Sequence, residues 1–249
     1  MSNTYPITWD NDGERRYELG CDHGVLYVKS ETPVIYTKST LAVAQQSGTG
    51  TATTPFTNGV AWNGLTSVSE NPSGADANDL WADNMKYASL RSAESFGATI
   101  EAYMYPNEFL PCDGCKNVNG VIVGQQKRQP FGFAYRSDVG SDSDVAVDKD
   151  TDYKLHLIYN ATASPSSKQY STINENPDAI TFSWEISTVP IPVGAIGGHA
   201  YRPVAHLVID STAADATKLA TLTSVLYGNN SQAPYLPMPE DIINFFNAT

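Results

Sequence analysis

The chain of 249 residues carries 15 basic and 27 acidic side chains, which gives a formal net charge of -12. This excess of acid excludes a surface that grips phosphate groups through counterion release, although it suits a surface past which a nucleic acid moves without sticking. Hydrophobic residues make up 41% and aromatic residues 10%, a mixture typical of half-buried pleated sheets, so we expect a mainly β fold.

Alternation of apolar and polar residues predicts antiparallel strands along most of the chain. In chain order they are expected at residues 24–29, 59–69, 85–91, 98–105, 121–126, 131–136, 153–159, 180–187 and 204–209. The clearest alternation is at 180–187, where Phe182, Trp184 and Ile186 point one way and Ser183, Glu185 and Ser187 the other. An alternation with a period of two residues defines these two faces of the strand but does not show which of them is solvated.

Two helices are predicted near the C-terminus. Residues 215–227 place leucines at helical spacing, with Asp215 as the N-cap and Gly228 just past the end. After a proline-rich stretch, residues 240–246 form a short amphipathic pattern whose first turn is acidic, as the helix dipole favours. We therefore expect a sheet with one or two helices packed against it.

Three segments without periodicity, residues 38–58, 138–152 and 190–201, are predicted to be long loops. Loops of this length are uncommon in one domain unless they bind something or become ordered on assembly. The sequence shows neither an internal repeat nor a linker, so residues 1–249 are interpreted as one domain. The first twenty residues lack the apolar core of a secretion signal and no apolar run could span a bilayer, so we expect synthesis in a cytoplasm and no membrane partner.

Two residue groups could hold a metal ion, and each has a simpler interpretation. The Asp-rich stretch 138–152 does not fit an EF-hand loop, which leaves an irregular calcium site or a solvated hairpin tip. Cys112 and Cys115, with Cys21 and His23, could supply four zinc ligands, but a single CxxC is weak evidence, and unpaired thiols in a reducing compartment are the simpler interpretation. We assign no metal ion and no cofactor from the sequence.

Catalytic patterns are absent from the sequence. It contains no GxSxG elbow, no GxGxxG turn and no P-loop, and its four histidines stand outside any recognisable motif. A hydrolase using paired carboxylates has no motif behind it. We therefore assign no catalytic residue and do not expect an enzyme.

Several motifs in a fixed order resemble the major tail tube proteins of siphophages, the phages with long non-contractile tails, in a branch found in phages of Gram-positive bacteria. They are GCDHGVLY (20–27), GVAWNGLTSVSENPSGA (59–75), LWADNMKY (80–87), SAESFGATIEAYMYPNEF (92–109), GQQKR (124–128), FGFAYR (131–136), KQYSTINENPDAITFSWEISTVPI (168–191) and the terminal KLATLTSVLYG with PYLPMPEDI. The Ser/Thr/Gly-rich segment before Gly59, the second cysteine Cys115 and the glycines at 194–198 depart from the family pattern.

The resemblance implies an antiparallel β-sandwich or barrel of the tail-tube type, with a flanking helix and a short C-terminal helix. Subunits of that family form rings, expected to be hexameric, which stack into the tail tube of the virion and conduct DNA during ejection. The implied partners are other copies of the chain, the tape measure protein, and the tail tip and tail terminator proteins. Ring closure also pairs strand edges that otherwise invite aggregation.

On this interpretation DNA passes through the lumen without specific binding. Glu101 and Glu185 are candidate lumen-facing acids, and Gln45, Gln46, Thr51 and Phe56 are candidate contacts between rings. Phage-derived tubes that carry no DNA, such as tailocins, use similar subunits and remain an alternative. A carbohydrate- or receptor-binding β-sandwich of a virion is the alternative from a different class, because exposed Tyr and Trp side chains stack on sugars.

Overall fold

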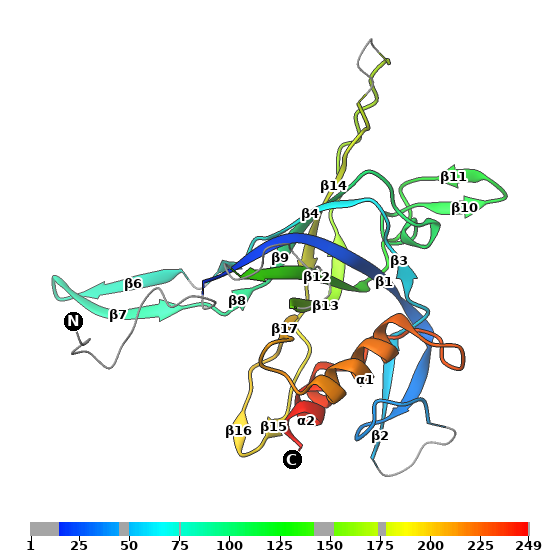
Figure 1. Cartoon of the computed structure of the whole chain (residues 1–249). Coiled ribbons are helices and arrows are strands. Elements are labelled where there is room, and N and C mark those ends of the chain that lie inside the picture. The colour runs from blue at the N-terminus through cyan, green and yellow to red at the C-terminus, as the bar shows by residue number, and fades with distance from the viewer. Residues whose placement is uncertain (1–14, 45–49, 75, 142–151, 174–177, 249) are drawn as a thin grey trace, which may run out of the picture.

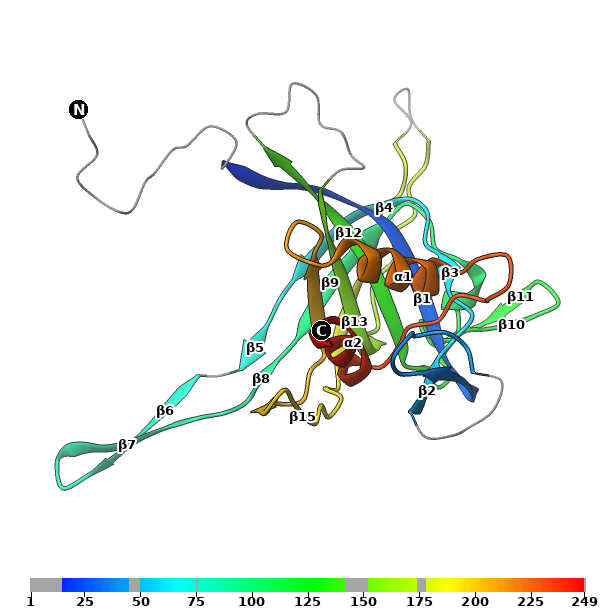
Figure 2. The same ribbon diagram turned by 60° about the horizontal axis from the view of Figure 1, so that its bottom comes forward.

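The computed structural model describes residues 15–44, 50–74, 76–141, 152–173 and 178–248. Figures 1 and 2 show a central body of strands and helices from which thin projections extend in different directions. The body is built on one antiparallel sheet with the strand order β2-β1-β12-β13-β14-β9-β4. The expected mainly β fold, with a large antiparallel sheet, is therefore confirmed.

The sheet uses strands of very different length. They are β1 (Arg16–Thr37), β2 (Thr51–Phe56), β4 (Leu65–Glu70), β9 (Gly97–Ala102), β12 (Phe131–Ser141), β13 (Tyr153–Ala163) and β14 (Phe182–Thr188). Two further strands join from the side, with β3 (Val60–Ala61) on β1 and β17 (His206–Asp210) on β13. Because β13 pairs first with β17 and then with β14, the sheet splays apart at this strand.

The sheet curls around an aromatic core. Inner side chains of β9 and β14 meet those of β12 in one buried cluster that includes Trp62, Phe133 and Trp184. The rings of Trp62 and Trp184 lie 5.5 Å apart in an edge-on arrangement, which aromatic pairs favour. The curl brings β4 back beside β1. Just after β3, the backbone N–H of Trp62 donates to the Gly24 carbonyl at 2.7 Å and extends the pairing of β3 with β1.

A second core lies on the opposite face of the sheet, beneath α1 (Ala216–Tyr227) and α2 (Pro239–Asn247). Figure 1 shows both helices gathered on this side. Gly132 in β12 leaves room for Leu236, since a Cβ at this glycine would lie 2.6 Å from the leucine methyl group. The buried Tyr27 hydroxyl donates to the Leu226 carbonyl at 2.7 Å and so ties α1 to β1.

Both predicted helices are confirmed. The Asp215 side chain accepts the Lys218 N–H at 2.9 Å, and Gly228 follows the last turn with φ 78°. The second helix begins at Pro239, one residue earlier than expected, because proline suits the first helical position. Neither α1 nor α2 has the length and hydropathy of a membrane span.

The predicted loops require correction. Residues 51–56 form β2 against β1, so 38–58 is not one loop, and its threonines are β-branched residues that suit an edge strand. The interval 190–201 contains the short hairpin of β15 (Ala195–Ile196) and β16 (His199–Ala200). The expected loop 138–152 begins later than predicted because β12 runs to Ser141, and residues 142–151 lie outside the described part.

Candidate assembly surfaces

The hairpin of β4 and β9 continues outward as a long two-stranded ribbon. It comprises β5 (Ser73–Gly74) paired with β8 (Glu94–Ser95), then β6 (Ala77–Ala82) paired with β7 (Met85–Arg91). Figures 1 and 2 both show this ribbon, residues 73–95, projecting well beyond the body. We call it the long arm.

The tip of the long arm is a two-residue turn that its sequence specifies. Asp83 and Asn84 have φ values of 52° and 59°, the left-handed pair that joins antiparallel strands with the correct twist and that Asp and Asn tolerate. An ion pair of 2.8 Å between Lys86 and Asp79 crosses the two strands. Hydrogen bonds from Lys86 and Ser89 lower the pKa of Asp79.

One face of the long arm is apolar and uncovered. The strand register places Leu80, Ala82, Met85, Ala88 and Leu90 on this face, with Asn78 opposite Leu90 as its polar member. Leu80 is 41% exposed, Met85 62% and Leu90 55%. An isolated two-stranded ribbon is marginally stable in water, and contiguous exposed apolar surface marks an interaction site. The apolar arm face is therefore a candidate contact with another protein surface.

Two more projections expose apolar side chains. The hairpin of β10 (Lys116–Val118) and β11 (Val121–Val123), which follows the short helix Asn107–Phe109, turns at Asn119 and Gly120 and exposes Val118, Val121, Ile122 and Val123. The segment between β13 and β14 leaves the body at the top of Figure 1, with Tyr170 73% and Ile173 87% exposed. Figure 1 shows the long arm and these two projections pointing away from the body in three directions.

The outer face of β4, β9 and β14 is lined by hydroxyl groups and carboxylates. The side chains opposite the aromatic core are Ser67, Ser69, Thr99, Glu101, Ser183, Glu185 and Ser187. Both predicted lumen-facing acids lie on this polar face, Glu101 half-buried on β9 and Glu185 exposed on the neighbouring β14. The Ser67 hydroxyl donates to Glu101 at 2.9 Å, and the three strands contain neither Lys nor Arg.

The candidate contacts between rings are placed very differently from one another. Gln45 and Gln46 lie outside the described residues. Thr51 is half-buried at the start of β2, where it pairs with Thr37. Phe56 is only 2% exposed in the core beneath the helices, so its side chain is not on a surface that a neighbouring ring could reach.

The cysteine-based zinc hypothesis finds no support among the described side chains. Cys21, Cys112 and Cys115 are free, and their sulfur atoms do not join His23 in a group close enough to share an ion. Cys112 is fully buried, and burial raises the pKa of its thiol to about 12. A thiol in that state is an inert core residue.

A bidentate ion pair holds the outer half of β1 on β12. The Arg136 guanidinium donates to both carboxylate oxygens of Asp22 at 3.0 Å. Burial alone would raise the pKa of Asp22, but hydrogen bonds from Arg136 and His23 outweigh it, and the net pKa is lowered. Bidentate arginine–carboxylate pairs of this kind fix the register of the two strands and also stabilise their pairing.

The sequence matches no protein-family model. No significant match is found among curated proteins either. The function of this chain therefore has to be inferred from its own residues and surfaces.

Proposed function

We propose that this chain is the structural subunit of a phage tail tube, which assembles with other copies of itself into stacked rings around a channel for DNA. The observation that carries the proposal is the uncovered apolar face of the long arm, with Leu80, Met85 and Leu90 between 41% and 62% exposed. The motifs that resemble siphophage tail tube proteins support it, and several of them lie in the arm and at its base.

The charge of the projections differs from one to another. The long arm carries Lys86 and Arg91 against Asp76, Asp79, Asp83 and Glu94, a balance of -2, while the whole chain carries -12. The hairpin of β10 and β11 contains Lys116 and no acid. This basic hairpin is complementary to the acidic bodies of neighbouring copies.

The projections also fit a subunit with several neighbours. A member of a stacked ring needs contacts on both sides and along the axis, and heterologous contacts of this kind close into rings or continue as tubes. The strands β2, β4 and β17 each pair on one edge only within the described sheet. Pairing such edges with a neighbour removes the aggregation hazard that they present in isolation.

The polar face supplies the property that a channel for DNA requires. Its hydroxyl groups are hydrated, and its carboxylates repel phosphates in a narrow space where screening is incomplete. We expect assembled wild-type tubes to retain no DNA at low salt. In the double variant Glu101→Lys/Glu185→Lys we expect DNA to co-sediment with the tubes at low salt and to be released as salt rises.

A charge-matched control separates a local effect from a change in net charge. Glu31 and Glu108 are exposed and lie outside the polar face, so Glu31→Lys/Glu108→Lys makes the same change elsewhere. Retention of DNA by the polar-face variant alone supports a lumen at this face. Equal retention by both variants, or by neither, would contradict it.

A carbohydrate-binding role is favoured by one observation, the exposure of Trp81 at 68% and Tyr87 at 74% on the long arm. Such rings stack on sugars when they stand free on a monomer. Size-exclusion chromatography over a range of concentrations, with passage over a polysaccharide matrix, distinguishes the two roles. Concentration-dependent assembly supports the tube subunit, and a monomer retained by the matrix supports the sugar-binding module.

A further inference from the structure

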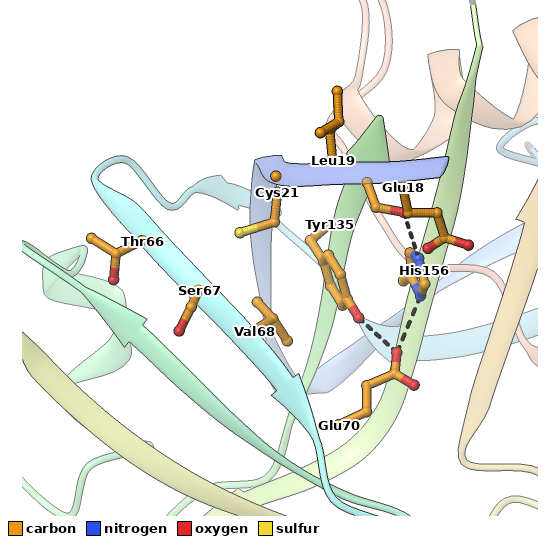
Figure 3. Close-up of a pocket in the computed structure, with 11 residues that line it drawn as sticks. Glu18, Leu19, Cys21, Thr66, Ser67, Val68, Glu70, Tyr135 and His156 are labelled. Carbon is orange, nitrogen blue, oxygen red and sulfur yellow. Dashed lines mark hydrogen bonds and ion pairs between the residues drawn. The ribbon is translucent and has the colours of Figure 1, made fainter. Parts of the chain in front are cut away.

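Three potential metal ligands from three distant strands converge at one end of the curled sheet. Glu70 is the last residue of β4, His156 lies in β13 and His206 begins β17. Glu70 Oε1 lies 3.2 Å from His156 Nδ1 and 3.3 Å from His206 Nε2, and the two nitrogens are 3.3 Å apart. Figure 3 shows Glu70 and His156 pointing toward one another.

The size of this triangle matches one face of a coordination tetrahedron. Zinc binds imidazole nitrogen and carboxylate oxygen at about 2.0–2.1 Å, which places two ligand atoms of a tetrahedron about 3.3 Å apart. All three edges agree with that separation within a tenth of an ångström. Without an ion, three groups would have to donate hydrogen bonds to the same oxygen, Glu70 Oε1. These groups are the Tyr135 hydroxyl and the ring N–H groups of the two histidines.

The surroundings hold each ligand in place. The Tyr135 ring stacks on His156 at 4.5 Å between centroids, and Phe96 stacks on His206 at 4.4 Å. The Ser137 hydroxyl lies 3.0 Å from His156 Nε2, where it can accept that N–H and leave Nδ1 free for a metal ion. The Tyr135 hydroxyl donates to Glu70 at 2.7 Å. Such outer partners orient metal ligands and strengthen binding.

The chemistry of the three ligands favours one class of metal ion. Both histidines are largely covered, with His156 8% exposed and His206 half-buried. Neutral imidazole is the coordinating form, and two imidazoles with one carboxylate favour Zn²⁺ over the oxygen-seeking Ca²⁺ and Mg²⁺.

We propose that Glu70, His156 and His206 form a binding site for Zn²⁺, with a water molecule from the adjoining pocket in the fourth position. That pocket has a volume of about 370 Å³, and Glu70 and His156 are among its lining residues. Three protein ligands and one open position is an established zinc geometry. Because Glu70 ends β4 just before the long arm, the ion would fasten the base of the arm to β13 and β17.

The test uses the purified chain after treatment with a chelator, at a concentration where it is monomeric. Calorimetric titration with ZnCl₂ is expected to give one ion per chain, and Co²⁺ is expected to show the visible absorption of tetrahedral coordination. At a free zinc concentration about 100 times the dissociation constant, the midpoint of thermal unfolding is expected to rise by about 5–10 °C.

Substitutions of the proposed ligands and of a neighbouring residue test where the ion binds. Glu70→Gln and His206→Gln each remove a ligand and are expected to abolish the one-to-one binding and the thermal shift. Tyr135→Phe keeps the ligands and removes a supporting donor, so we expect zinc affinity to fall about 10- to 100-fold. The control His199→Gln removes an exposed histidine outside the cluster and should bind as the wild type does.

Two results would overturn the site. One is the absence of saturable zinc binding by the wild type, and the other is binding by Glu70→Gln as tight as that of the wild type. Glu70 is partly exposed and lies at a strand end, so this variant decides the question even where a histidine variant fails to fold. Because the titration uses monomers, its outcome is independent of whether the chain forms tubes.

Discussion

The apolar arm face leads to a quantitative prediction for self-assembly. Replacing Leu80 and Leu90 by serine removes two side chains that are 41% and 55% exposed on the subunit. Together their exposed fractions amount to about one leucine, whose full burial contributes about 1.5–3 kcal/mol. Each arm contact is therefore expected to weaken by about 10- to 100-fold, since about 1.4 kcal/mol is a tenfold change in an equilibrium constant.

The assay is the critical concentration for assembly, measured by ultracentrifugal pelleting over a dilution series. Each added subunit contributes one long arm, so Leu80→Ser/Leu90→Ser should raise that concentration by the same factor. Leu90→Met keeps an apolar side chain and should assemble as the wild type does. Ala77→Ser places a new hydroxyl on the opposite face of the same ribbon and is the matched control.

The folded subunit should be unaffected, because both leucines lie outside the two buried cores. Substitutions at such surface positions usually change the free energy of unfolding by less than about 0.5 kcal/mol. A critical concentration that stays within twofold of the wild-type value, in a variant with unchanged thermal unfolding, would refute the role of the apolar arm face.

Two further predictions concern the stability of the subunit. Tyr36 is fully buried, accepts the Met238 N–H at 2.8 Å and donates to the buried Asp241 at 2.6 Å. Tyr36→Phe removes both hydrogen bonds and leaves Asp241 with its ion pair to Lys38, so it should cost about 1–3 kcal/mol in thermal unfolding. The exposed Tyr170→Phe is its control, and equal unfolding midpoints for Tyr36→Phe and the wild type would contradict the role of these bonds. Asp22→Asn should destabilise the subunit at neutral pH, because the folded pKa of Asp22 lies below its ordinary value of 3.8. The Asp22 carboxylate therefore stabilises the fold above pH 3.8, and this contribution is lost as pH falls through the folded pKa. The difference between Asp22→Asn and the wild type should therefore shrink below about pH 4 in chemical unfolding, and a difference that is constant down to pH 2 would speak against the ion pair with Arg136.

Local signals in the sequence predict much of the body. The cap at Asp215 and the glycine at 228 mark α1 because capping acts within a few residues. The alternation at 180–187 predicts β14 and the two directions of its side chains, with Trp184 buried and Glu185 exposed. Each of these elements buries one face, and the apolar residues of that face recur at regular spacing within the element itself.

Features that depend on distant partners could not be predicted. The strand β2 has a loop-like composition and becomes a strand by pairing with β1. The sequence predicts the second strand of the long arm, residues 85–91, but not its partner β6, although Asp83 and Asn84 are a turn signal that could have revealed the hairpin. The cluster of Glu70, His156 and His206 depends on the curl of the sheet, because no local spacing relates the three residues.

Negative-stain electron microscopy of the purified chain, at concentrations above the onset of assembly, tests self-assembly into a tube most directly. The account predicts stacked rings that form hollow tubes with a central channel, and their loss in Leu80→Ser/Leu90→Ser at the same concentration. A chain that remains monomeric at every concentration, with the apolar arm face intact, would contradict it.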